Sequence, residues 1–153
     1  MQSNLAVTYD NLGRYHESLP LKRAVYSGHL RLYGEEHGHT LRAATNYANN
    51  LLALERYAEA KSVLREIIPV ARRVLGECND LTLRMRWCYA IALYGDADAT
   101  LDDLREAVTT LEDGERIARR VLGGAHPVVS NMETSLRKAR AALRARETPS
   151  SET

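Results

Sequence analysis

The sequence has no phenylalanine, one tryptophan and only two cysteines among its 153 residues. Because neither cysteine has a CxxC neighbour, we expect two reduced thiols rather than a disulfide or a zinc site. The longest apolar run, residues 89–94, is far too short to cross a bilayer. The net charge is +1, so no bulk field favours nucleic acid or an anionic membrane. We therefore expect a cytoplasmic protein that binds neither nucleic acid nor a membrane.

Signals for β-strands are also missing, because the sequence contains no alternating apolar pattern and no Asn-Gly or Asp-Gly turn. Apolar residues recur instead at helical spacing, as in residues 63–75. This spacing predicts helices over residues 3–12, 14–33, 40–54, 57–75, 80–94, 100–122 and 127–146. The sequence therefore predicts an all-α protein.

What the sequence does contain is an internal repeat. Gly34, Gly76 and Gly123 each follow a basic, apolar helix end, at spacings of 42 and 47 residues. A shift of 42 residues matches nine identical positions between residues 4 and 34 and their counterparts, without a gap. The third unit follows the same pattern after five extra residues. A fixed period of this length indicates stacked units that bury their apolar faces against one another.

The repeat carries a resemblance to a known family. The segments YANNL at residues 47–51 and YAIAL at 89–93 resemble the first helix of a tetratricopeptide repeat. The 42-residue period and the segment HGHTLR at residues 37–42 are similar to the kinesin-light-chain-like subfamily. The resemblance implies a right-handed α-solenoid of antiparallel helix pairs.

The expected organisation follows from the repeat boundaries. We predict an incomplete first repeat (1–34), a second repeat (35–76), a third repeat (77–123) with an insertion near 95–101, a C-terminal capping helix (124–146) and a disordered tail (147–153). The first unit begins partway through its first helix, which indicates a piece of a longer array. It also has Ser18 and Lys22 where the pattern has a small and a large packing residue.

Catalytic motifs find no support in the sequence. Gly123-Gly124 lacks the lysine and hydroxyl residue of a phosphate-binding loop. His37, His39 and Cys78 form an incomplete zinc ligand set without an i, i+4 or CxxC frame. We therefore expect no enzyme activity, no cofactor and no metal, and keep a metal-dependent enzyme that uses these three residues as the least favoured alternative.

Binding residues follow from the resemblance, which implies a concave groove lined by the first helix of each repeat. The groove positions so implied are Arg42, Thr45, Asn46, Asn49, Arg84, Trp87, Asn131 and Lys138, with Asn4, Val7, Cys88, Ile91, Thr134 and Ser135 on the same faces. None of these residues is acidic. The asparagine amides can donate to and accept from an extended peptide backbone, and the arginine and lysine side chains attract carboxylates. Two alternatives stay open: Asn46 and Asn49 as an ordinary solvated face, and Trp87 as a core residue.

The sequence therefore predicts a non-catalytic protein–protein interaction scaffold. Its partner would present an extended peptide that is acidic or ends in a free C-terminus. One alternative is a structural spacer within a longer repeat array. Another is self-association through Leu5, Val7 and Leu12, which the incomplete first repeat leaves exposed.

Overall fold

The computed structural model describes residues 2–148, with side chains from residue 4 onward, and this part of the chain contains helices and no strand. The helices are α1 (Gln2–Asn11), α2 (Tyr15–Tyr33), α3 (Gly38–Ala53), α4 (Tyr57–Leu75), α5 (Asp80–Gly95), α6 (Leu101–Leu122) and α7 (Pro127–Glu147). Each lies within two residues of the range predicted from apolar spacing. The last residues of the expected tail, 149–153, fall outside the described part.

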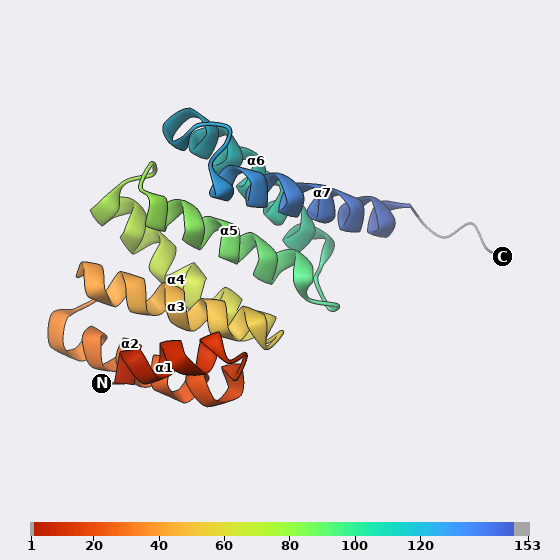
Figure 1. Ribbon diagram of the computed structural model, residues 1–153. Coiled ribbons are helices and arrows are strands. Elements are labelled where there is room, and N and C mark those ends of the chain that lie inside the picture. The colour runs from red at the N-terminus through yellow and green to blue at the C-terminus, as the bar shows by residue number, and fades with distance from the viewer. Residues whose placement is uncertain (1, 149–153) are drawn as a thin grey trace.

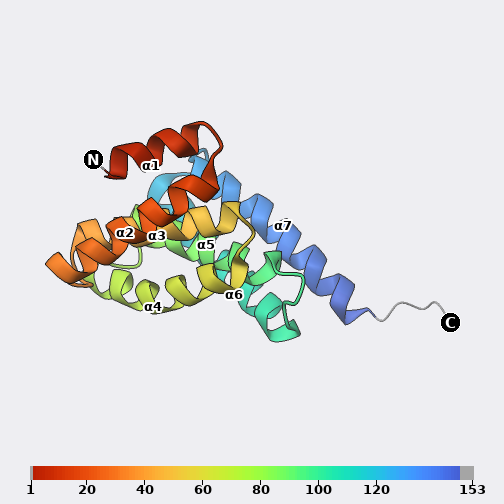
Figure 2. The ribbon, with the colours of Figure 1, turned by 90° about the horizontal axis from the view of Figure 1, so that it is seen from below.

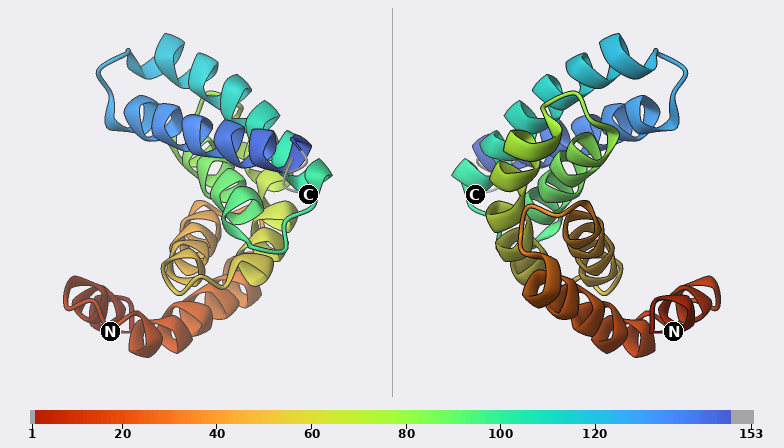
Figure 3. Two further views of the ribbon diagram at one scale, coloured as in Figure 1. Left: turned by 90° about the vertical axis from the view of Figure 1, so that its right-hand side faces the viewer. Right: turned by 90° about the vertical axis from the view of Figure 1, so that its left-hand side faces the viewer.

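The helices form a right-handed solenoid in which each helix packs on the next in chain order (Figure 1). Contacts between α3 and α5 and between α5 and α7 add a second set of neighbours. In the view from below, α7 extends past the other helices toward the C-terminus (Figure 2). Seen from the side, the array curves between α1 at one end and α6 and α7 at the other (Figure 3). The odd-numbered helices line the inner side of this curve.

Three glycines end the second helix of each repeat. Gly34, Gly76 and Gly123 have φ of +83°, +89° and +89°, a region that other residues rarely adopt. The N–H of each donates to the carbonyl four residues earlier, so the last turn stays hydrogen-bonded. The glycine period recognised in the sequence is thus a period of helix stops.

Polar side chains begin the following helices. His37, Asn79 and His126 each accept a hydrogen bond from the backbone N–H two residues later, at the N-termini of α3, α5 and α7. Helix α6 starts differently, with a reciprocal capping box between Thr100 and Asp103. This cap fixes the end of the connection 96–100 between α5 and α6, which is longer than the corresponding connection between α3 and α4. The sequence predicts the insertion in this region.

Small residues at the helix contacts form the core. Ala48, Ala71, Ala90 and Ala118 are fully buried within one continuous apolar cluster. The second helices also carry small-then-large pairs, Ala60 with Leu64 and Ala107 with Leu111, and all four side chains are fully buried. Alanine at these positions lets neighbouring helices approach closely, while the leucines fill the space between them.

The first repeat replaces this apolar pair by a polar network. Ser18 is fully buried and donates to Asp10 Oδ1 at 2.5 Å. Lys22 donates to Asn50 Oδ1 at 2.8 Å and forms an ion pair with Asp10. Asn50, itself buried, also donates to the carbonyl of Tyr15 at 3.2 Å. Because every buried polar group here has a partner, the junction between α1, α2 and α3 holds together without the usual leucine.

The turn between α3 and α4 places a residue in a strained backbone conformation. Glu55 has φ +58°, and Gly13, which occupies the same position one repeat earlier, has φ +72°. A side chain costs roughly 1–2 kcal/mol in this region relative to glycine.

We expect Glu55→Gly to raise the free energy of unfolding by about 0.5–1 kcal/mol, because it relieves this strain. Urea denaturation monitored by circular dichroism measures the change. Ala24→Gly, on the exposed face of α2, is the matched control and should lower stability by about 1 kcal/mol. A loss of stability in Glu55→Gly would contradict the assignment of strain to this turn.

Candidate functional site

A groove on the inner side of the solenoid lies between α3, α5 and the N-terminus of α7. It encloses about 370 Å³ and is lined by Asn49, Arg84, Trp87, Cys88, His126, Pro127, Val128 and Asn131. We call it the inner groove. Five of the residues implied by the sequence resemblance, Asn49, Arg84, Trp87, Cys88 and Asn131, thus lie around one space.

Trp87 forms one wall of the inner groove and also belongs to the packing. Its ring is partly buried against the main apolar cluster. Its indole N–H donates to Ser135 Oγ on α7 at 2.9 Å. Trp87 therefore packs on the core and also lines the inner groove. The hydrogen bond fixes the orientation of the ring, and the part of the ring that lines the groove remains open to a ligand.

A buried thiol orients the amide of Asn49. Cys88 is 3% exposed, and its Sγ–H donates to Asn49 Oδ1 at 2.9 Å. Burial raises the pKa of Cys88 to about 12, so the thiol stays protonated and keeps donating. With its oxygen held by the thiol, the exposed Asn49 amide has its N–H donors available to a ligand.

The charge of the inner groove is basic but partly compensated. Arg84 lies 3.0 Å from Asp80, one turn earlier on α5, and both side chains are about half exposed. None of the residues that line the inner groove is acidic, and Asp80 lies beside Arg84 without lining the groove. Arg42 and Lys138 are exposed and form no ion pair among the described residues. They do not line the inner groove.

Other predicted groove positions are distributed differently. Asn46 is exposed and lines a smaller cavity of about 70 Å³ between α1, α2 and α3, together with Val7 and Lys22. Thr45 is 4% exposed, and its hydroxyl donates to the carbonyl of Leu41. Contrary to the prediction, Thr45 is therefore inaccessible.

Ser135 and Cys88 are likewise buried, although the repeat register assigns both to the groove face, and of the two only Cys88 borders the inner groove. Conversely, the wall at the N-terminus of α7 consists of His126, Pro127 and Val128, none of which the sequence pattern placed in a groove. The segment His126-Pro127 was visible as a helix start. Its position beside Trp87 depends on how α7 packs on α5, which no local pattern reports.

The alternative metal set is not assembled. The rings of His37 and His39 stack at a centroid distance of 5.1 Å, within a cluster that includes Tyr33 and His29. Cys78 is exposed in the turn between α4 and α5. Among residues 2–148, no three His, Cys, Asp or Glu side chains are grouped as metal ligands. His37 instead caps α3 through Nδ1.

Comparison with known proteins agrees with this architecture. Residues 1–73 match the tetratricopeptide repeat family. The solved kinesin-light-chain-type TPR-like repeats of Podospora anserina have 20% identity and a TM-score of 0.79, covering 99% of this chain and 77% of that one. A single-substitution variant of those repeats has 23% identity and a TM-score of 0.80, covering 92% and 64%. No curated protein sequence matches the chain.

A further solved structure with the same fold is BtubC (BKLC) from P. vanneervenii, with 14% identity and a TM-score of 0.59 over 99% of this chain and 65% of that one. Residues 1–73 are thus similar to tetratricopeptide repeats, and the helical solenoid formed by residues 2–148 has the fold of the kinesin-light-chain-like repeats. Repeats of this family generally mediate protein–protein interactions and are generally non-catalytic. None of the described helices is both long enough and apolar enough to span a membrane.

The two cysteines should differ sharply in reactivity. At pH 8, a thiol of pKa about 12 is ionised to about one part in ten thousand, and the thiolate is the reactive form. We expect one fast-reacting thiol per folded chain toward Ellman's reagent and two in urea. Cys78→Ser should abolish the fast phase, because Cys78 is the exposed thiol. Two fast thiols in the folded wild type would contradict the burial of Cys88.

Proposed function

We propose that the chain is a non-catalytic scaffold whose inner groove binds an extended peptide of a partner protein, with acidic residues or a free C-terminal carboxylate. The observation that carries this proposal is the convergence of Trp87 with cationic and amide side chains around one open space. Aromatic rings held at the centre of a groove are typical anchors for a partner side chain.

Each wall of the inner groove has a distinct role in the proposed complex. Trp87 and the exposed Pro127 offer apolar surface to a leucine or aromatic side chain. The amides of Asn49 and Asn131 can donate to and accept from an extended backbone. Arg84 would exchange its exposed partner Asp80 for a ligand carboxylate, which costs little because solvent already screens that pair.

We expect an extended acidic peptide to bind with a Kd on the order of 1–100 μM. Arg84→Glu should weaken binding about tenfold or more at low salt, by loss of pairing and by repulsion, and added salt should shrink the difference. Isothermal titration measures both. Arg116→Glu on α6, a change of the same charge at an exposed arginine outside the inner groove, is the control and should leave the Kd unchanged. A chain that binds no acidic peptide would instead be a spacer.

Trp87→Ala should weaken the same peptide by roughly 2 kcal/mol. Because Trp87 also packs on the core and bonds Ser135, this change should lower the midpoint of thermal unfolding as well. Trp87→Phe separates the contribution of the apolar ring from that of the hydrogen bond to Ser135, since it retains most of the apolar contact while losing the indole N–H. Unchanged peptide affinity in folded Trp87→Ala would show that the ring serves packing alone.

A second candidate role is self-association through α1. Leu5, Val7 and Leu12 are 46%, 53% and 65% exposed, and α1 packs only on α2 among the described helices. Apolar surface of this kind commonly marks an interaction site. Light scattering across a concentration series should then show dimers that Leu5→Glu removes. A strictly monomeric wild type would eliminate this role.

A further inference from the structure

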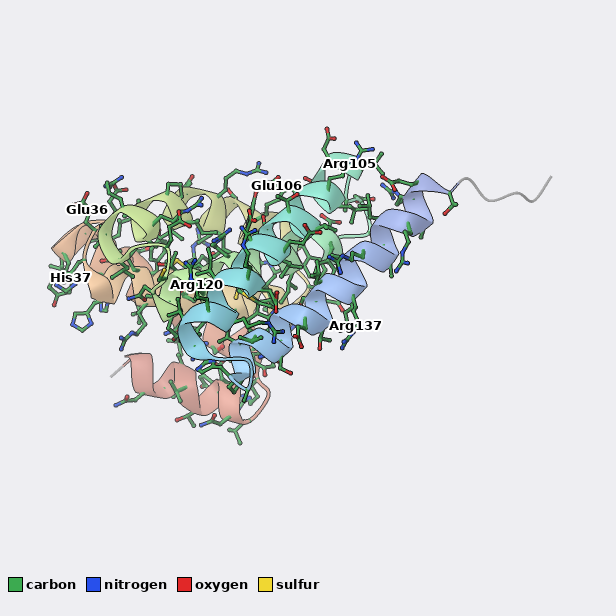
Figure 4. The ribbon with its side chains drawn as sticks, turned by 90° about the horizontal axis from the view of Figure 1, so that it is seen from above. Glu36, His37, Arg105, Glu106, Arg120 and Arg137 are labelled. Carbon is green, nitrogen blue, oxygen red and sulfur yellow. The ribbon has the colours of Figure 1, made fainter. Side chains whose placement is uncertain are left out.

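A second cavity, of about 230 Å³, opens on the outer side of the solenoid between α4 and α6, with α5 as its floor. It is lined by Arg65, Ile68, Pro69, Arg72, Arg86, Tyr89, Glu106 and Thr110. We call it the outer cavity. Figure 4 shows Glu106 on the side of α6 that faces away from α1. The lining thus carries three arginines and one carboxylate, and belongs to a different face from the inner groove.

Arg86 is the unusual member of this lining. Its side chain is only 7% exposed, and its one hydrogen bond within residues 2–148 reaches Glu77 at 3.5 Å. Glu77 lies closer to Arg72, at 2.6 Å. Because a guanidinium has five N–H donors, most of those on Arg86 have no protein acceptor among the described residues and remain open to solvent or a ligand in the outer cavity.

The surroundings of Arg86 indicate that the missing acceptor is negative. Burial lowers the pKa of Arg86, and the neighbouring charge of Arg72 lowers it further, while Glu77 and Asp113 oppose the shift. Asp113 is engaged by Arg116 at 2.8 Å. An anion in the outer cavity would therefore supply both the hydrogen bonds and the charge that Arg86 lacks.

The preceding repeat shows how the same junction is built without these cations. One period earlier, Arg86 and Arg72 correspond to Ala44 and Leu30. There the rings of Tyr26 and Tyr47 stack at 6.2 Å and occupy the junction. Packing of the solenoid thus does not require arginine at either position, and the two cations need another explanation.

We propose that the outer cavity is an oxyanion site that binds a phosphate group through Arg86 and Arg72, with Arg65 at its rim. Arginine forks match phosphate oxygens in bidentate geometry and are favoured for phosphate recognition. The rim carboxylate is restrained, because Glu106 accepts from the Tyr89 hydroxyl at 2.7 Å and lies 3.8 Å from Arg65. The ligand is either free phosphate or a phosphate ester on a partner's side chain.

Urea unfolding in inorganic phosphate, compared with sodium chloride at matched ionic strength, tests the site. Phosphate at ten times its Kd should lower the unfolding equilibrium constant about elevenfold relative to chloride. Arg86→Ala and Arg72→Leu, which copy the residues of the preceding repeat, should each abolish most of this difference. Arg23→Ala is the matched control, because Arg23 is the counterpart of Arg65 at the junction without the two cations. It should keep the full effect.

Titration with a phosphoserine peptide and its unphosphorylated twin distinguishes the source. Tighter binding of the phosphopeptide than of inorganic phosphate assigns the site to a phosphorylated partner, and the reverse order assigns it to the free ion. Equal stabilisation of the wild type by phosphate and chloride would overturn the proposal. A phosphate effect that survives both Arg86→Ala and Arg72→Leu would also overturn it. If Arg86→Ala does not fold, the phosphate effect on Arg72→Leu alone provides the test.

Discussion

The close approach of helices at buried alanines is the constraint on which the rest of the structure depends. No single helix pair buries its apolar face, so each layer is completed by the next. Ala48, Ala90 and Ala107 have no side chain beyond Cβ, which lets the neighbouring backbones come near and directs the larger side chains to the edges of the contact. The inner groove and the outer cavity lie at those edges, on different faces of α5.

At the junction of α1, α2 and α3, polar residues replace the apolar pair that packs the other repeats. Ser18 retains the small volume, but Lys22 replaces the large apolar residue, and its charge requires Asp10 and Asn50 as partners. A buried ion pair often contributes less net stability than well-packed apolar residues of similar volume, because its charges lose their hydration. Because the backbone of α1 packs closely on α2 alone among the described helices, its attachment depends mainly on this network and on the α1–α2 packing. The array is thus least cohesive at this end.

Much of the fold could be predicted from the sequence, because glycine stops and apolar spacing are local signals that repeat. The candidate site was harder. Thr45 and Ser135 lie on the predicted helix faces, yet neighbouring helices cover the margins of those faces and leave only a narrow strip open. The contribution of His126 depends on how one repeat sits on the next. Arg86 looked like any surface arginine, since its burial results from side chains on three helices.

Helix α5 is where the two candidate sites meet, since it contacts α3, α4, α6 and α7. Arg86 and Trp87 are consecutive, and consecutive residues on a helix point about 100° apart. One side chain therefore reaches the outer cavity while the next reaches the inner groove. The third repeat differs from the second at both positions, where Ala44 and Thr45 stand one period earlier. Arg86 and Trp87 thus contribute, from adjacent positions, to features that distinguish this repeat on both of its faces.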